Sequence, residues 1–285
     1  MKKLLILSGK GGTGKTTIAA SFINLLNVKA FADCDVDAPN LHLINKSDKP
    51  FANTNFYGSK KAKINKNRCV FCGRCRSVCR FDAIKMNIGN YTVDEYACEG
   101  CGVCEYVCPQ KAIVLVDDVA GDLMLQKDGF VFSTAKLKMG RGNSGKLVSQ
   151  VKKQLDQNSD NDIAIIDGSP GIGCPVIASI SGVDMVLIVA EPSMSGMSDM
   201  ERILKTIKQF GVKPLVCVNK YDTSTDKTEE IINFCKQNKI EFVGKIPYDK
   251  EVLVAVNKGK SIVDFACPAT EAIKEIFDKV KLLLL

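Results

Sequence analysis

The chain has 285 residues, of which 46% are hydrophobic and 25% are charged, the balance of an ordinary globular protein. This length suits one large α/β domain together with a small module. No apolar run approaches the roughly 20 residues that a membrane helix needs, and the apolar stretch within residues 1–7 is too short for a signal peptide. We therefore expect no membrane span and a cytoplasmic location.

The net charge of +7 would be compatible with nucleic-acid binding, but the lysines are spread along the chain without a dense basic block. A solvated surface is favoured over a nucleic-acid site. Thirteen cysteines would indicate disulfides in a secreted protein, yet eight of them fall in two tight runs. That pattern indicates a metal centre.

Short β-rich runs alternate with helical periodicity on both sides of residues 59–117, which predicts an α/β fold with a doubly wound, mostly parallel sheet. Residues 59–117 lack this alternation of strand and helix, and they contain the eight clustered cysteines in two similar halves. We expect one domain formed by residues 1–58 and 118–285, and an inserted domain formed by residues 59–117. The predicted strands are 3–7, 28–32, 163–166, 185–190, 214–218 and 242–246, and helical periodicity covers 197–210 and 228–238.

The first predicted strand leads into Ser-Gly-Lys-Gly-Gly-Thr-Gly-Lys-Thr-Thr (8–17), which opens a predicted helix. In such a P-loop the glycines let backbone N–H groups face phosphates, and the helix N-terminus favours negative charge. Lys15 is expected to reach the β- and γ-phosphates, and Thr16 to ligate Mg²⁺. The predicted nucleotide contacts are Gly9, Gly11, Gly12, Thr13, Gly14, Lys15, Thr16 and Thr17. Residues 140–146 have similar spacing, but Leu147 replaces the hydroxyl that Mg²⁺ needs, so an ordinary loop is predicted there.

The additional Lys10 gives the loop a form that resembles the deviant Walker A family, which includes MinD, ParA, the nitrogenase iron protein and the Mrp-type cluster scaffolds. The resemblance implies a Mg²⁺-dependent ATPase that uses Lys10 and Lys15. It also implies that Lys10 crosses a two-fold interface to the partner's nucleotide, so the chain would dimerise. A solvated loop residue is the alternative for Lys10.

Two further segments resemble the switches of this family. In Ala-Asp-Cys-Asp-Val-Asp (32–37), the resemblance implies that Asp35 orients the attacking water. In Ile-Ile-Asp-Gly-Ser-Pro-Gly (165–171), it implies that Asp167 holds the water shell of Mg²⁺. The alternative for the first segment is that its acidic residues only cap the next stretch of chain.

Late segments resemble the base-reading part of the same family, with Asn219 at a strand end and Pro247 and Asp249 in a flanking loop. However, Asn-Lys-Tyr-Asp (219–222) also matches the guanine-reading Asn-Lys-x-Asp of GTPases. ATP is therefore favoured by the resemblance and not by this segment. An asparagine that only closes a turn is a further alternative.

Two cysteine runs share the spacing C-x2-C-x2-C-x3-C. In this spacing the first three thiolates of a run ligate one 4Fe-4S cubane, and the fourth ligates a second cubane. We predict one cluster on Cys69, Cys72, Cys75 and Cys108, and a second on Cys98, Cys101, Cys104 and Cys79. Structural zinc is the alternative, and its paired spacing fits these triplets poorly.

The repeat resembles bacterial two-cluster ferredoxins across the insert, except that Arg80 replaces the proline expected after the fourth cysteine. Arg74, Arg76 and Arg80 add positive charge near one cluster, which favours its reduced form. We therefore expect two unequal reduction potentials.

Cys174 follows Asp167 at the offset of a cluster-ligating cysteine in the nitrogenase iron protein, which gives the hypothesis of an additional interface cluster. No second cysteine stands within residues 138–142, where that protein's other ligand would be sought. A buried, inert cysteine at a helix start is the favoured alternative. Cys34, Cys217, Cys235 and Cys267 are expected to be structural.

Two functions remain open. The chain is either an ATP-gated electron donor that works through two 4Fe-4S clusters, or an ATP-dependent factor that assembles or carries iron-sulfur or metal cofactors. Both imply a homo- or heterodimer through the nucleotide face and a redox or cofactor-accepting protein partner. A positioning ATPase on DNA or membrane finds no support, because residues 270–285 are not clearly a basic amphipathic helix.

Overall fold

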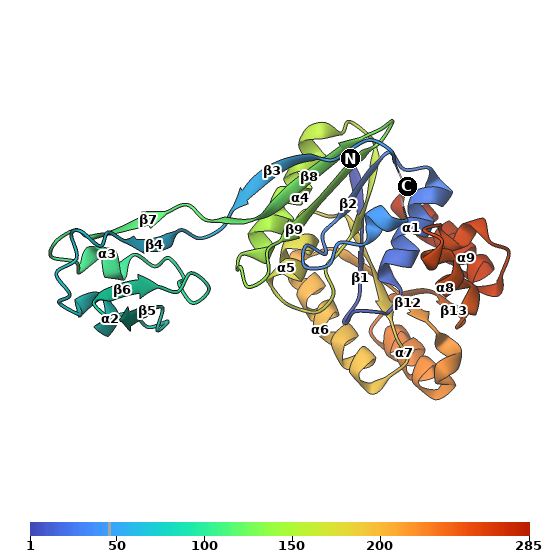
Figure 1. Cartoon of the computed structure of the whole chain (residues 1–285). Coiled ribbons are helices and arrows are strands. Elements are labelled where there is room, and N and C mark those ends of the chain that lie inside the picture. Colours follow the sequence, from blue (N-terminus) through green and yellow to red (C-terminus); the bar gives the residue numbers. More distant parts are fainter. Residues whose placement is uncertain (45–46) are drawn as a thin grey trace. The chain divides into compact units, whose positions relative to one another are not determined.

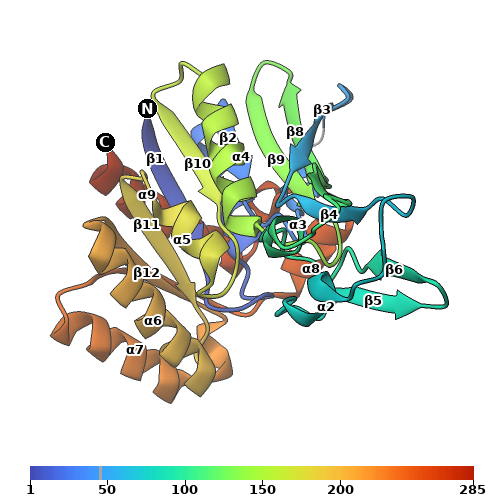
Figure 2. The same cartoon turned by 90° about the vertical axis from the view of Figure 1, so that its left-hand side faces the viewer.

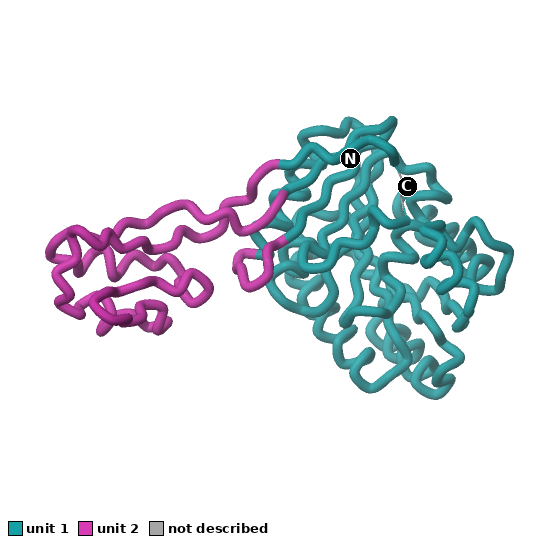
Figure 3. Tube along the Cα trace, in the orientation of Figure 1, with its two compact units in different colours: residues 1–53, 123–136, 144–285 teal, residues 54–122, 137–143 magenta. Residues whose placement is uncertain are grey.

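The computed structural model describes residues 1–44 and 47–285, which divide into two compact units (Figures 1 and 3). Unit 1 comprises Met1–Asn53, Leu123–Lys136 and Ser144–Leu285. Unit 2 comprises Thr54–Asp122 and Leu137–Asn143. The segment 59–117 lies within unit 2, which extends beyond it at both ends and also takes in the turn 137–143.

The main sheet of the described chain has nine strands in the order β13-β12-β11-β1-β10-β2-β9-β8-β3. Neighbours from β13 to β9 pair in parallel, so the expected doubly wound, mostly parallel α/β fold is confirmed. The strands are β1 (Lys2–Leu7), β2 (Ala30–Asp33), β3 (Ala52–Tyr57), β8 (Val119–Lys127), β9 (Val131–Leu137), β10 (Ile163–Asp167), β11 (Met185–Ala190), β12 (Lys213–Asn219) and β13 (Glu241–Ile246).

The six predicted strands occur within two residues of their expected ends, whereas β3, β8 and β9 were not predicted. Strand β9 shows why a strand of this sheet was missed in the sequence. Its buried centre contains Ser133 and Thr134 and therefore lacks the apolar run that marks a core strand. It is held by pairing with β2, about a hundred residues away, in the register Ala30 opposite Val131.

The helices described in unit 1 cover both faces of its sheet, with α4 to α7 on one face and α1, α8 and α9 on the other (Figure 2). The core between α1, α9 and the sheet includes Leu4, Phe22, Ile165, Leu187 and Phe277. The helices are α1 (Lys15–Leu26), α4 (Ser144–Asn158), α5 (Cys174–Ile180), α6 (Met194–Phe210), α7 (Thr225–Gln237), α8 (Lys250–Asn257) and α9 (Pro268–Leu284), with short 3₁₀ turns η1 (Leu41–Leu43), η2 (Tyr221–Thr223) and η3 (Ile262–Asp264). Among the described residues, no helix is both long and apolar enough to cross a membrane.

Unit 2 has two antiparallel strand pairs and two one-turn helices. Strand β4 (Lys61–Ile64) pairs with β7 (Ile113–Val116), and β5 (Ile84–Asn87) pairs with β6 (Asn90–Val93). Helices α2 (Arg74–Ser77) and α3 (Val103–Tyr106) complete it.

The sequence repeat of unit 2 has a counterpart in its backbone. Gly73 and Gly102 precede α2 and α3 with φ of 76° and 80°. Asp82 and Lys111 adopt φ of 48° and 46° at matching positions. The two halves therefore share one local conformation around each cysteine run.

Candidate functional site

The phosphate loop joins β1 to α1 at the carboxyl ends of the parallel strands. Gly12 and Gly14 adopt φ of 78° and 92°, a region that favours glycine. At Gly14 a Cβ atom would lie 2.3 Å from Nδ2 of Asn219, so a side chain would clash there. Helix α1 starts directly after this loop at Lys15, so its free N–H groups form a site suited to an anion.

Lys15, Thr16 and Asp167 meet behind the phosphate loop. Nζ of Lys15 lies 2.5 Å from Oδ1 of Asp167, and the Thr16 hydroxyl donates to Oδ2 of Asp167 at 2.6 Å. Lys15 is 5% exposed and Asp167 is fully buried. The fold thus brings together the three side chains that the sequence assigned to phosphate and Mg²⁺.

Asp33, the last residue of β2, is a fully buried carboxylate that the sequence analysis did not single out. It accepts hydrogen bonds from the backbone N–H groups of Asp35 at 3.0 Å, Asn40 at 2.9 Å and Leu41 at 3.0 Å. These bonds fix the loop that carries Asp35. Asp33 thereby fills the capping role that the sequence left open for the acidic residues of 32–37, and it ends a buried strand as Asp167 does.

Burial and neighbouring charges shift the pKa of Asp33, Lys15 and Asp35. Burial and the neighbouring charge of Asp167 raise the pKa of Asp33 to about 7. Burial lowers the pKa of Lys15, but the charges of Asp167 and Asp33 outweigh burial and raise it overall. Asp35 is half-buried, and burial raises its pKa although Lys15 opposes the shift. The cation Lys15 therefore stays charged among three carboxylates.

A cavity of about 780 Å³ opens beside these residues, within the size range of ligand sites. One part of its wall is polar and contains the phosphate loop from Gly11 to Thr17, together with Asp35. The other part is apolar and contains Ile246, Leu253 and Ile273. A polar end joined to an apolar end suits a ligand with phosphates and a flat base.

Asn219 and Lys220 contact the phosphate loop from β12. Nδ2 of Asn219 donates to the Thr13 carbonyl at 2.7 Å, and Nζ of Lys220 donates to the Gly12 carbonyl at 3.1 Å. Both residues line the cavity, whereas Pro247 and Asp249 do not. Asp249 instead caps α8 by accepting the Glu251 N–H at 3.0 Å.

Lys10 lies outside this cavity wall and is paired within its own chain. Its Nζ is 2.5 Å from Oε2 of Glu191, and Nζ of Lys220 is 3.7 Å from Oε1 of the same carboxylate. The hydrogen bond and charge of Lys10 lower the pKa of Glu191. At Gly9, a Cβ atom would lie 2.2 Å from Cβ of Asp199, so this position has no room for a side chain.

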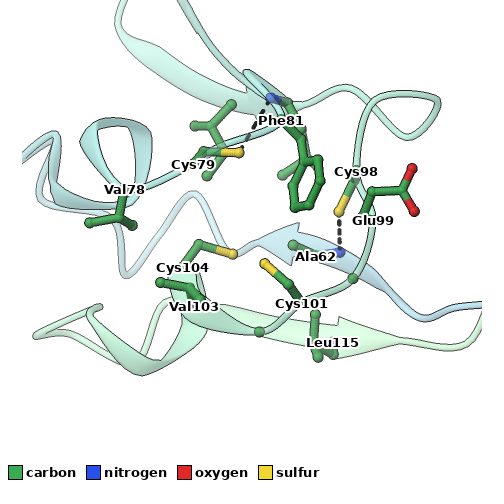
Figure 4. A pocket seen from close by; sticks show the side chains of 15 residues that line it. Ala62, Val78, Cys79, Phe81, Cys98, Glu99, Cys101, Val103, Cys104 and Leu115 are labelled. Carbon is green, nitrogen blue, oxygen red and sulfur yellow. Dashed lines mark hydrogen bonds between the residues drawn. The ribbon is translucent and has the colours of Figure 1, made fainter.

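Two small cavities of about 20 Å³ each lie among the cysteines of unit 2. One is lined by Cys69, Cys72, Cys75 and Cys108, and the other by Cys98, Cys101, Cys104 and Cys79. We call them the first and the second cysteine cavity. Each combines three cysteines of one run with the fourth of the other run, and Figure 4 shows the second.

Backbone N–H groups donate to several of these sulfur atoms. The N–H of Ala62 donates to Cys98 at 3.5 Å, that of Ala83 to Cys79 at 3.4 Å, and that of Ala112 to Cys108 at 3.2 Å. Such bonds stabilise negative charge on sulfur and tune iron-sulfur potentials. Within residues 1–44 and 47–285, no three His, Cys, Asp or Glu side chains are grouped as ligands for a single metal ion.

Among the five cysteines outside the two runs, the exposure of one differs from expectation. Cys174 begins α5 as expected, but it is exposed, so the prediction of a buried residue was wrong. It precedes Pro175 in the first turn of α5, where the chain leaves the loop after Asp167. Cys34, Cys217 and Cys235 are buried, and Cys267 is half-buried.

The second segment with P-loop-like spacing is a loop only in part. Residues 140–143 lie outside helices and strands, as expected of a loop, but α4 starts at Ser144, so the prediction of an ordinary loop fails for its last residues. Leu147 is fully buried on the core side of α4. This helix start therefore serves packing, and it offers no hydroxyl at the Mg²⁺ position.

Comparison with known proteins identifies the family to which this fold belongs. The model of the CobQ/CobB/MinD/ParA nucleotide binding domain matches residues 4–262. An uncharacterized protein of Methanocaldococcus jannaschii is 34% identical over 98% of this chain and 96% of its own length. An iron-sulfur cluster carrier protein of Pyrococcus furiosus is 23% identical over 98% of this chain and 85% of its own length.

The solved structure of the cell division ATPase MinD of Pyrococcus furiosus has a TM-score of 0.61 with this chain, at 18% identity and 99% coverage of both chains. MinD of Pyrococcus horikoshii, solved with Mg-ADP, has a TM-score of 0.59 at 17% identity, over 99% of this chain and 96% of that one. These structures share the fold. With the family match over most of its length and a complete phosphate loop, the chain belongs to the CobQ/CobB/MinD/ParA nucleotide-binding family as a P-loop ATPase of the MinD/ParA type.

Proposed function

We propose that this ATPase carries two 4Fe-4S clusters in an inserted ferredoxin-like domain of residues 59–117 and couples its nucleotide state to electron transfer. The observation that carries the proposal is the pair of cysteine cavities, each ringed by three cysteines of one run and one of the other. A single zinc ion draws sulfurs to about 2.3 Å of itself, whereas a cubane spreads four thiolates over four irons. Four thiols around a small cavity suit the cubane.

Cys69, Cys72, Cys75 and Cys108 would hold one cluster, and Cys98, Cys101, Cys104 and Cys79 the other. When bound, such clusters supply one-electron chemistry. The N–H groups of Ala62, Ala83 and Ala112 would offset the negative charge on the ligating sulfurs.

At the nucleotide site, Lys15 and the glycine-rich backbone would bind the phosphates of ATP, and Thr16 and Asp167 would hold Mg²⁺ or its water shell. Asp35 would orient the water that attacks the γ-phosphorus, with ADP as the leaving group. Asn219 and the apolar wall at Ile246 would lie along the base. The partly exposed cation Lys10 would leave Glu191 and reach the nucleotide of a second protomer across a two-fold interface.

A second function, the assembly or delivery of iron-sulfur cofactors, is favoured by one relative. The Pyrococcus furiosus protein that aligns with 98% of this chain is named an iron-sulfur cluster carrier protein. The exposed thiols of Cys72 and Cys101 would give an acceptor protein access to each cluster. In this function the clusters are cargo and leave the protein.

The proposal is tested by anaerobic purification, assay of iron and acid-labile sulfide, and EPR with and without ATP. We expect iron and sulfide for two clusters, and a loss of about half in Cys101→Ser. The control Cys267→Ser, which alters a half-buried thiol of unit 1, should keep both clusters. Oxygen-free protein without iron and sulfide would refute the cluster proposal and leave the ATPase assignment intact.

ATP turnover separates the two functions. Retention of both clusters with faster electron transfer supports the electron donor. Transfer of iron and sulfide to an apo-protein during turnover supports the carrier.

A further inference from the structure

The two halves of the cysteine-rich segment carry opposite charge. Residues 59–93 contain nine Lys and Arg against one acidic residue, whereas residues 94–118 contain six acidic residues against one Lys. Each half supplies three of the four cysteines of one cavity. In space the contrast is smaller, because Lys60 pairs with Asp117 and Arg141 pairs with Glu95 and Asp118.

The charged residues that line each cavity have the same sign as the half of the segment that supplies three of its cysteines. Arg74 lines the first cysteine cavity, and none of the described acidic residues does so. Glu99 lines the second, as Figure 4 shows, where no basic residue of the described chain is found. The linings of the two cavities therefore differ in charge in the same direction as the two halves of the sequence.

Exposed apolar and basic residues follow one another along the chain at the first cysteine run. Val70 and Phe71 are 57% and 49% exposed, although they flank the exposed ligand candidate Cys72. Phe71 is held in place by a left-handed backbone, φ 57°, and by stacking on Tyr91 with ring centroids 6.3 Å apart. Aromatic residues and arginine are the residue types enriched at the centre of protein interfaces.

Two arginines of this run, Arg68 and Arg74, are available to a partner. Arg68 and Arg74 are exposed, and within the described residues neither forms an ion pair. Arg141 in the same unit shows the contrast, since its guanidinium is paired with Glu95 and Asp118. Unpaired arginines steer an oppositely charged protein toward the surface and orient it.

We propose that Arg68, Val70, Phe71, Cys72 and Arg74 form a docking surface, here called the arginine face, for an acidic one-electron carrier protein. This inference rests on the proposed clusters. One electron passes between the carrier and the cluster at the first cavity, so that one is oxidised as the other is reduced, and no bond or proton is exchanged. Glu99 and Glu105, which are exposed in the other half of the segment, repel the same carrier and favour one productive orientation.

Flavodoxin, an acidic flavoprotein, serves as the probe, and basic cytochrome c serves as its counterpart. The full-length, anaerobic protein is reduced with dithionite and freed of excess reductant, and its oxidation is followed by stopped flow. We expect the second-order rate with flavodoxin to fall steeply as salt rises. Arg68→Glu with Arg74→Glu should lower that rate at least tenfold and remove most of its salt dependence.

The matched control is Lys205→Glu with Lys236→Glu, which changes the net charge equally at exposed positions of α6 and α7. Its rate should stay within twofold of the unaltered protein. Binding is also measured directly from chemical-shift changes in labelled flavodoxin, a readout that does not require electron transfer. Iron content and EPR signals are recorded for every variant, so that cluster loss, which is failure of the proposed function, is distinguished from loss of docking.

Equal flavodoxin rates for both double variants, with clusters intact, would overturn the proposal. So would a faster, salt-sensitive reaction with cytochrome c, because it would assign docking to the acidic half. Binding of a duplex DNA fragment that is as tight as flavodoxin binding and equally lost in Arg68→Glu with Arg74→Glu would overturn it in favour of a nucleic-acid surface.

Discussion

Lys15 is a buried cation whose charge is balanced by Asp167 and Asp33, both fully buried. Removing it leaves the buried Asp167 carboxylate without its ion-pair partner, and breaking a buried pair in this way costs about 3–5 kcal/mol. We expect Lys15→Ala to lose this much stability at pH 7, measured by urea unfolding, together with Mg-ATP binding measured by calorimetry.

Lys10→Ala is the matched control, because its pair with Glu191 is partly exposed, at 38% and 23% of the two side chains. Exposed pairs contribute about 0–1 kcal/mol. Equal destabilisation by the two variants would contradict the assigned role of the buried charge.

Asp33 gives stability a specific pH dependence. In the unfolded chain its proton leaves near the ordinary value of 3.8, whereas burial and Asp167 raise its pKa in the folded chain to about 7. Between these values the folded state binds more protons, so the free energy of unfolding falls as pH rises, by at most about 1.4 kcal/mol per unit. Between pH 4 and 7, unaltered protein should therefore lose stability relative to Asp33→Asn.

Asp37→Asn, an exposed neighbour in the same loop, should keep the slope of the unaltered protein. Urea unfolding at pH 4.5, 5.5 and 6.5 measures all three proteins. If the free energy of unfolding changes with pH in the same way for unaltered protein and Asp33→Asn, then Asp33 does not hold a proton in the folded state.

At the scale of elements, prediction from sequence succeeded where the signal is local. Apolar runs gave the six parallel core strands, and contiguous spacing gave the phosphate loop with Lys15 and Thr16. Strand β9 was missed because its evidence lies in its pairing with β2. The partners of Asp33 and Lys10 were also missed, since Leu41 and Glu191 reach them only through the fold.

The turn 137–143 depends on Arg141, whose side chain is 10% exposed. Its guanidinium donates to the Glu95 carbonyl at 3.0 Å, pairs with Asp118 at 3.2 Å and lies 5.0 Å from the centre of the Tyr96 ring. Charge-assisted bonds of this kind contribute about 1.5–3 kcal/mol each. We expect Arg141→Ala to raise amide hydrogen exchange at least tenfold in residues 94–97 and 137–143.

Arg76→Ala is the control, because Arg76 is exposed on α2 and lies in the same unit. Its exchange in those two segments should match that of the unaltered protein. Uniform acceleration across unit 2 by Arg141→Ala would indicate general destabilisation and would contradict a local role for this side chain.

At the scale of the whole molecule, the two units differ in what stabilises them. Unit 1 has a continuous core that joins its sheet to α1 and α9. The core of unit 2 is small and contains Ala62, Ala83, Ile84, Tyr91, Ile113 and cysteines. A core this small usually needs a metal or disulfides, and a metal bound only by the folded chain adds its binding free energy to stability.

Chelation of the iron of the proposed clusters under anaerobic conditions should therefore unfold the cysteine-rich segment and spare the ATPase. We expect proteolysis within residues 59–117 to become fast, while residues 144–285 stay resistant and Mg-ATP still binds, because the core of unit 1 contains no residue of this segment. Limited proteolysis with mass spectrometry, and calorimetry with ATP, measure the two outcomes on one sample. If the segment stays resistant after iron is removed, its hydrophobic residues suffice without clusters, and the metal would serve chemistry alone.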